Sequence, residues 1–202
     1  MIDDLFRNNR EWAEARRRLD ADFFPRLARQ QAPAYLWIGC ADSRVPANEI
    51  VGLDPGELFV HRNIANQAPA TDINYLAVLA YAVDVLRVRH VIVCGHYGCG
   101  GIRAALRDER QGLVEHWLAP VRDTMARHRG ALADAPDEVA RTDLLAELNV
   151  RDRVGDVAAT LTIQDAWRRG QPVAVHGWIY AVADGLLRDL QVSRTGPAPD
   201  PA

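Results

Sequence analysis

Four short apolar runs recur along the chain and are separated by longer segments of helical character. They read AYLWIG from residue 34, ELFVHRN from residue 57, RHVIVCG from residue 89 and PVAVHGWIY from residue 172. Their apolar residues are nearly continuous, as in strands that are buried on both faces of a sheet. Strands that alternate with helices build parallel sheets covered by helices on both faces. The sequence therefore predicts an α/β fold with a central, mainly parallel β-sheet covered by α-helices.

The segments around these runs carry the start and stop signals of helices. We expect an amphipathic helix over residues 3–19 and a second helix over residues 22–29. Thr71 is a suitable N-cap for the helix between the second and third runs. One long helix, or two helices joined near Gly155, is predicted over residues 141–170, which end in two arginines and a glycine.

Length and charge are those of one ordinary domain. The chain has 202 residues and a net charge of −3, which is enough for a single domain with a sizeable core. No basic block indicates a nucleic-acid partner, and no apolar run is long enough to span a membrane. We expect one domain over residues 1–202, with a helical arm over residues 1–30 and a flexible, Pro-rich tail over residues 194–202.

The basic residues and the cysteines narrow the possible chemistry. All 24 basic residues are arginine, so a lysine Schiff base and a phosphate-loop lysine are both excluded. The three cysteines are an odd number that suits a reducing compartment better than a disulfide framework. Because the N-terminal segment has no apolar signal core, we expect a cytoplasmic location.

The reactive residue types gather at the ends of two predicted strands. The first strand ends in the pattern Cys40-x-Asp42-x-Arg44, and the third is followed by His96 and Cys99 in a Gly-rich turn. Ligands of open parallel sheets bind beyond the carboxyl ends of the strands, so these residues converge if the two strands are neighbours. Two thiolates and an imidazole suit Zn²⁺, and three protein ligands leave the fourth position that a catalytic zinc needs. Asp42 can orient zinc-bound hydroxide or bind the metal itself, and Arg44 can hold it away.

Plainer interpretations of these residues stay open. A structural zinc site would need a fourth protein ligand, which here could only be a carboxylate. A phosphatase-type nucleophile at Cys40 would need five residues before its arginine, and Arg44 comes too early. Cys94 lies inside an apolar run and is expected to be a buried core thiol. The other histidines are scattered without ligand spacing: His61, His90, His116, His128 and His176.

The blocks around these residues resemble those of the beta-class carbonic anhydrases. They read CADSRVPA, ELFVHRNIAN and CGHYGCGG, and the resemblance continues through LAELNV and HGWIYAVADGLLRDL, from about Phe23 to Leu190. Outside that family we expect these blocks together only in close relatives that hydrolyse carbon disulfide or carbonyl sulfide. The resemblance implies a zinc lyase, a carbonate dehydratase that hydrates carbon dioxide reversibly by attack of zinc-bound hydroxide.

Carried over residue by residue, the resemblance implies one Zn²⁺ per chain. Its ligands would be Cys40, His96 and Cys99, and the catalytic dyad would be Asp42 and Arg44. In a closed state of the site, Asp42 would also bind the metal. Two alternatives use the same centre: hydrolysis of carbon disulfide or carbonyl sulfide, and an inactive, zinc-stabilised scaffold. The intact dyad argues against a scaffold, since a purely structural site has no use for it.

The resemblance also implies substrate contacts and an assembly. Gln31 matches a residue that hydrogen-bonds substrate, and Phe59 resembles one that lines the carbon dioxide pocket from the partner subunit. The family's minimal unit is a dimer with active sites at the subunit interface, often paired into tetramers. We therefore expect a homodimer or homotetramer that handles carbon dioxide and bicarbonate. Tyr97 lies next to a ligand in sequence, which is only a weak argument for a proton shuttle.

One subtype of the family carries a non-catalytic bicarbonate site. Its pattern is a Trp two residues before the Gly of the first block, an Arg after the His of the second, and a Tyr in the HGW block. Trp37, Arg62 and Tyr180 match that pattern. The subtype implies inhibition by bicarbonate and by low pH, because bicarbonate breaks the dyad and the carboxylate moves onto the zinc. The plainer interpretation is two core aromatics and a structural ion-pair partner.

Overall fold

The sheet has five strands, four of them parallel. The computed structural model describes residues 2–108 and 112–196, and the strand order is β2-β1-β3-β4-β5. The strands are β1 (Tyr35–Cys40), β2 (Leu58–Asn63), β3 (His90–His96), β4 (Ala174–Ala181) and β5 (Leu186–Asp189). The first four are parallel, and β5 pairs antiparallel with β4. The four predicted strands and the mainly parallel sheet are confirmed, whereas β5 was not predicted.

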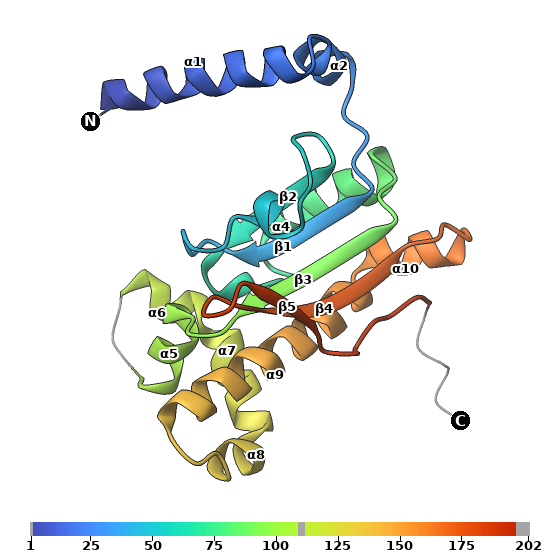
Figure 1. The fold of residues 1–202 in the computed structure, drawn as a ribbon. Helices are drawn as coiled ribbons and strands as arrows, with labels where there is room; N and C mark the ends of the chain where they lie inside the picture. The colour runs from blue at the N-terminus through green and yellow to red at the C-terminus, as the bar shows by residue number, and fades with distance from the viewer. Residues whose placement is uncertain (1, 109–111, 197–202) are drawn as a thin grey trace.

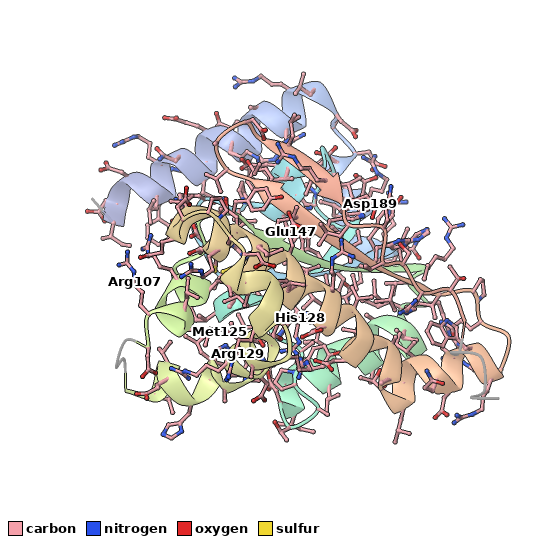
Figure 2. All side chains as sticks on the ribbon, turned by 90° about the horizontal axis from the view of Figure 1, so that it is seen from below. Arg107, Met125, His128, Arg129, Glu147 and Asp189 are labelled. Carbon is pink, nitrogen blue, oxygen red and sulfur yellow. The ribbon has the colours of Figure 1, made fainter. Side chains whose placement is uncertain are left out.

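Helices connect the strands and cover the sheet unequally. Within the described residues, the α-helices are α1 (Ile2–Leu19), α2 (Phe23–Arg29), α3 (Ala47–Ile50), α4 (Ile73–Ala80), α5 (Gly100–Leu106), α6 (Leu113–Trp117), α7 (Ala119–Arg127), α8 (Arg129–Ala133), α9 (Glu138–Ala159) and α10 (Leu161–Arg168). A 3₁₀ turn, η1, covers Ile64–Asn66, and a π turn, η2, covers Tyr81–Val85. The long helix α9 packs on β3 and β4 and crosses the sheet in both views (Figures 1 and 2).

Two predicted helix boundaries are wrong, for local reasons. The N-cap of α4 is Asp72, whose carboxylate accepts the backbone N–H of Asn74, and not Thr71. The break between α9 and α10 falls at Thr160, whose hydroxyl accepts from the N–H of Ile163. Gly155 stays helical, because a glycine in an exposed helix interior costs only about 1 kcal/mol.

The core lies between the helices and one face of the sheet. Strands β1 and β3 are buried along almost their whole length, as expected for central parallel strands. The opposite face carries a smaller cluster that includes Trp37 and Cys94. It is covered by residues around α3, and Trp178 and Tyr180 at its edge are only partly buried. Helical cover is therefore heavier on one face than the two-sided prediction implied.

The first helix extends away from the sheet. In the described chain no residue of α1 is buried, and Leu5 and Phe6 are 60% and 64% exposed. Figure 1 shows α1 projecting from the rest of the chain, joined to it through α2. At the other end, Arg194 exchanges two backbone hydrogen bonds with Val175. Residues 197–202 of the predicted tail lie outside the described residues.

The helices carry no membrane-spanning signal. None of those within residues 2–108 and 112–196 combines the length and the apolar character needed to cross a bilayer.

Candidate metal centre

Three potential metal ligands meet at the carboxyl ends of two neighbouring strands. Cys40 is the last residue of β1, His96 is the last residue of β3, and Cys99 lies in the turn that follows. Because β1 and β3 pair in parallel, their ends reach the same edge of the sheet. All three residues are buried, and their ligand atoms lie within 4.8 Å of one another. The convergence predicted from the sequence is confirmed.

The spacing of the two sulfurs suits a tetrahedral metal. Cys40 Sγ lies 3.9 Å from Cys99 Sγ. Two sulfurs that each lie about 2.3 Å from a tetrahedral zinc are separated by roughly 3.8 Å. The three cysteines of the chain are free thiols, so no disulfide competes for these atoms.

The His96 ring is oriented for coordination. Its Nδ1 lies 3.0 Å from the carbonyl oxygen of Tyr97, so this nitrogen carries the proton and donates it to the carbonyl. The Nε2 atom is buried and has no hydrogen-bond partner among the described residues. A buried nitrogen with a free lone pair, facing two thiols, fits a bound metal.

The two thiols of the centre differ in how readily they lose a proton. The pKa of the Cys40 thiol is lowered, chiefly because the Cys99 thiol lies close enough to donate a hydrogen bond to its sulfur. The pKa of Cys99 is raised, because its proton is shared with Cys40 and the thiol is buried. In this arrangement Cys40 is the first thiol to ionise, and a bound cation would favour loss of the second proton as well.

Asp42 is held beside the three ligands by Arg44. The Arg44 side chain donates from Nε to Oδ1 at 2.9 Å and from Nη2 to Oδ2 at 2.7 Å, and its backbone N–H donates to Oδ1 at 3.0 Å. This pairing holds the pKa of the Asp42 carboxyl well below its usual range. Asp42 Oδ2 lies 3.7 Å from His96 Nε2, close to the group but outside the three-ligand set.

The glycines of the turn have different tasks. Gly98 has φ +66°, which a residue with a side chain rarely adopts. Gly101 is needed for close packing, since a Cβ there would lie 3.0 Å from Ile64 Cγ2 and 3.2 Å from Ala65 Cβ. Gly95 still belongs to β3, and a Cβ there would lie 2.6 Å from Val150 Cγ2. Gly98 is therefore the glycine that this turn requires for its backbone conformation.

The three residues predicted to form a bicarbonate site share the sheet face that carries the smaller cluster, the one with Trp37 and Cys94. The strand register places Trp37, Arg62 and Tyr180 on this face. Trp37 is fully buried, and its Nε1 has no hydrogen-bond partner in the described chain. Arg62 donates from Nε to the carbonyl of Cys40 at 2.8 Å and from Nη2 to the carbonyl of Asp42.

Two predicted substrate residues do not reach the ligand group within one chain. Gln31 precedes β1, whereas Cys40 ends that strand. Phe59 lies four positions before Asn63, the β2 partner of Cys40, which is roughly 13 Å along a strand. Its ring packs at 5.9 Å from that of Tyr81, a residue that the sequence analysis did not select.

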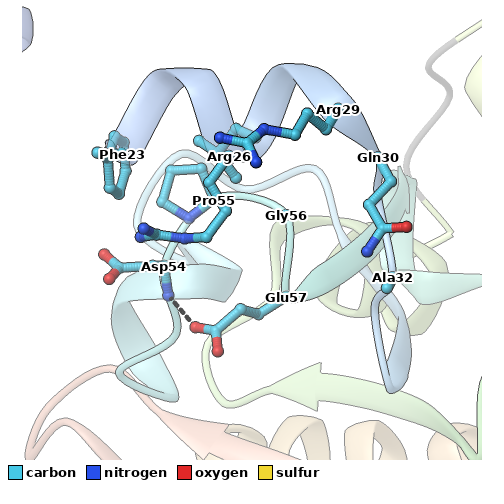
Figure 3. A pocket seen from close by; sticks show the side chains of 10 residues that line it. Phe23, Arg26, Arg29, Gln30, Ala32, Asp54, Pro55, Gly56 and Glu57 are labelled. Atoms are coloured by element: carbon cyan, nitrogen blue, oxygen red, sulfur yellow. Dashed lines mark hydrogen bonds between the residues drawn. The ribbon is translucent and has the colours of Figure 1, made fainter. Parts of the chain in front are cut away.

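Two other features lie outside the centre. A pocket between α2 and residues 54–57 (Figure 3) is lined by no cysteine or histidine. The hydroxyl of Tyr97 donates at 2.5 Å to Oε1 of Glu147, a residue of α9 that Figure 2 labels. Burial and this carboxylate raise the pKa of Tyr97 to about 12, which is too high for a proton shuttle near neutral pH.

Comparison with known proteins gives one consistent result. The carbonic anhydrase family profile matches residues 35–187. The carbonic anhydrase of Emericella nidulans is 45% identical over 194 residues, which cover 96% of this chain and 85% of that protein. The carbonic anhydrase of Pseudomonas aeruginosa is 34% identical, with coverages of 94% and 86%.

Solved structures agree with the sequence relatives. A Coccomyxa beta-carbonic anhydrase in complex with acetazolamide superposes with a TM-score of 0.92 at 38% identity, covering 97% of this chain and 89% of that one. One of two tetrameric beta-carbonic anhydrases from Sordaria macrospora also gives a TM-score of 0.92, at 39% identity, with coverages of 96% and 98%.

Proposed function

The chain belongs to the beta-class carbonic anhydrases and is a carbonate dehydratase, and from this premise we propose that Cys40, His96 and Cys99 hold one catalytic Zn²⁺ per chain. The substrates of the enzyme are carbon dioxide and bicarbonate. The observation that carries the assignment is the buried, unpaired Nε2 of His96 within 4.8 Å of two thiols. A Zn²⁺ ion held there would act as a Lewis acid and bring the pKa of water toward neutral pH.

Asp42 and Arg44 orient the reaction in this proposal. Asp42 is ionised at neutral pH because Arg44 stabilises its carboxylate. An ionised carboxylate is an acceptor only, so Asp42 can accept a hydrogen bond from the attacking oxygen and direct its lone pair toward carbon dioxide. While both of its oxygens face Arg44, Asp42 stays out of the ligand set and leaves room for a solvent molecule.

Two cysteine variants test the ligand assignment. Cys99→Ser should lose bound zinc and hydration activity in a stopped-flow assay with a pH indicator, across about pH 6.5 to 9. Cys94→Ser is the matched control, because Cys94 is an equally buried thiol outside the ligand group. It should keep both zinc and activity. If Cys99→Ser kept its zinc, or if the wild type hydrated carbon dioxide no faster than background, the proposal would fail.

The same centre could act on a sulfur-containing substrate. Carbon disulfide and carbonyl sulfide present a similar electrophilic carbon to the same site. Sulfide release from either substrate, compared with the rate of carbon dioxide hydration, separates the two activities. If sulfide were released faster than carbon dioxide is hydrated, the sulfur compound and not carbon dioxide would be the principal substrate.

We propose in addition that bicarbonate regulates the enzyme through Trp37, Arg62 and Tyr180. The unpaired Trp37 N–H is a donor available to an anion, and Arg62 supplies positive charge on the same face. Arg62 also donates to the backbone of Cys40 and Asp42. An anion that drew Arg62 away would release these carbonyls, loosen Asp42 from Arg44 and let the carboxylate close the metal site.

Conservative variants test the regulatory site. Trp37→Phe and Tyr180→Phe each remove one polar group and keep the ring. Both should weaken inhibition by added bicarbonate and by low pH. Trp178→Phe, on the same face, is the control and should keep normal inhibition. Unchanged inhibition in both test variants would exclude this site.

We propose a single domain over residues 1–202 that assembles as a homodimer or homotetramer, with residues 1–30 as an arm that contacts a partner subunit. Gln31 and Phe59 lie away from the ligands of their own chain, so they can serve the substrate only in a second copy. The exposed apolar residues of α1 and the tetrameric Sordaria relative support this assembly. Light scattering of the full chain and of a variant lacking residues 1–30 tests it, and a monomeric full chain would exclude it.

Because thiol ligands must be reduced, we place the enzyme in a reducing compartment such as the cytoplasm.

A further inference from the structure

Ala65 has an unusual backbone conformation beside the metal centre. It lies in η1 with φ 60° and ψ 30°, the left-handed region, and it is fully buried. This conformation costs a residue with a Cβ roughly 1–2 kcal/mol. It persists only where the surrounding structure enforces it. Its neighbours therefore show what holds it in place.

Two buried side-chain amides clamp the carbonyl of Ala65. Gln67 Nε2 donates to this oxygen at 2.7 Å, and Asn149 Nδ2 donates to it at 3.1 Å. Gln67 Nε2 also donates to Asn149 Oδ1 at 2.9 Å, so the two amides fix each other. Gln67 and Asn149 are both 0% exposed. The clamp joins η1 to α9 across more than 80 residues of sequence.

Arg153 braces the clamp from the next turn of α9. Its Nη1 donates to Gln67 Oε1 at 2.7 Å, and its Nε lies 2.7 Å from Asp156 Oδ2, an ion pair without the alignment of a hydrogen bond. Only 3% of Arg153 is exposed. Burying a guanidinium and two amides is costly unless their polar atoms are paired. An apolar core of the same volume would avoid that cost, which points to a task other than filling space.

Ala65 also belongs to the same buried cluster as both sulfur ligands. The turn η1, which carries Ala65, contacts β1, the strand that ends in Cys40. The methyl group of Ala65 packs against Gly101, where a Cβ would lie only 3.2 Å away. Gly101 belongs to α5, the helix that begins directly after Cys99. Ala65 therefore lies between the segments that carry the two sulfur ligands.

We propose that Asn149 and Gln67, braced by Arg153, are positioning residues of the metal centre. By clamping the Ala65 carbonyl they fix η1 between the end of β1 and the start of α5, and so keep the two sulfur-bearing segments at the spacing that retains zinc. This proposal rests on the zinc assignment made above for Cys40, His96 and Cys99. The clamp touches neither substrate nor metal, and it acts only through Ala65.

The test measures metal retention directly. Asn149→Leu and Gln67→Met keep similar volumes and remove the donors to Ala65. Zinc transfer from each folded holoenzyme to a chromogenic chelator should become roughly 10–100-fold faster, the usual effect of losing a group that supports a metal ligand. The thiolate-to-metal charge-transfer band of the cobalt-substituted protein should shift, because the positions of the two sulfur ligands change.

A matched variant separates positioning from general destabilisation. Thr142→Val removes a buried hydroxyl from the same helix, where it donates to the carbonyl of Glu138 at 2.8 Å. It should lower Tm by a similar amount and leave the zinc release rate and the cobalt band unchanged. If Thr142→Val released zinc as fast as Asn149→Leu, or if both clamp variants released it at the wild-type rate, the proposal would be overturned.

The wild type provides a readout that does not depend on the folding of any variant. Amide hydrogen exchange at Ala65 should be slow in the zinc form and faster after chelation, while exchange at Leu145 of α9 changes little. Equal exchange at Ala65 in both forms would overturn the proposal. A wild type that bound no zinc at all would instead refute the proposed function, so the two failures are distinguishable.

Discussion

Replacing Arg44 by alanine removes the group that fixes the Asp42 carboxylate. Two side-chain hydrogen bonds are lost, at 2.9 Å and 2.7 Å. A hydrogen bond to a charged group contributes roughly 1.5–3 kcal/mol when it is shielded from water. The Arg44 side chain is 54% exposed, so solvent screening leaves the pair only a small contribution to stability. Tm should therefore fall by only about 2–4 °C.

Activity should fall much further than stability. Without Arg44 the carboxylate can rotate away from its position 3.7 Å from His96 Nε2. A positioned acid–base group typically contributes 10²–10⁴-fold to a rate. At the lower end of that range, kcat/KM for carbon dioxide hydration in Arg44→Ala should fall about 100-fold, which corresponds to ~2.7 kcal/mol in the barrier.

The assay combines stopped-flow hydration with zinc content per chain and thermal unfolding. Arg168→Ala is the control, because it removes an exposed arginine paired with Asp165 on α10, away from the ligands. It should keep wild-type activity. The reasoning is refuted if zinc-loaded Arg44→Ala stays within about twofold of the wild type, or if Arg168→Ala loses activity to the same degree.

Three further outcomes depend on buried groups. Gly95→Ala should lower the free energy of unfolding by about 1–3 kcal/mol, because the added Cβ would lie 2.6 Å from Val150 Cγ2; an unchanged denaturation midpoint would count against this packing. Burial lowers the pKa of His61 in the folded protein below its ordinary 6.5. Above pH 6.5 the imidazole is neutral in both the folded and the unfolded chain, whereas below pH 6.5 the unfolded chain binds the proton more readily. Stability should thus fall as the pH drops from about 6.5 toward the folded-state pKa, and His61→Gln should flatten that slope, measured by urea unfolding; an equal slope would contradict it. Tyr97→Phe should leave the shape of the pH–rate profile between about pH 6.5 and 9 unchanged, since the pKa of Tyr97 is raised to about 12; the loss of one limb of the profile would show that Tyr97 transfers protons.

The metal centre was predictable because local patterns carry it. Cys40 and His96 each end a continuous apolar run, and the rule for parallel sheets brings the ends of neighbouring strands to one edge. The short spacing from His96 to Cys99 then adds the third ligand in a turn marked by glycines. Each of these signals lies within a few residues of the group that it positions.

Features that depend on distant contacts were not predictable. An alanine carries no sequence signal for a left-handed conformation, and the two side chains that hold the Ala65 carbonyl, Gln67 and Asn149, come from outside its own turn. Asn149 and Arg153 look like ordinary polar residues of a helix until the sheet places that helix against η1. Strand β5 is a local feature, since it pairs with β4 just before it in the chain; it was missed because it is short and mostly exposed.

X-ray absorption at the zinc edge tests the central claim most directly. If Cys40, His96 and Cys99 hold the metal, the first shell should contain two sulfurs at about 2.3 Å and two nitrogen or oxygen atoms at about 2.0–2.2 Å. Cys99→Ser should then show one sulfur fewer, or no bound zinc at all. A wild-type first shell of nitrogen and oxygen alone would contradict the account. So would a protein that contains no zinc and still hydrates carbon dioxide.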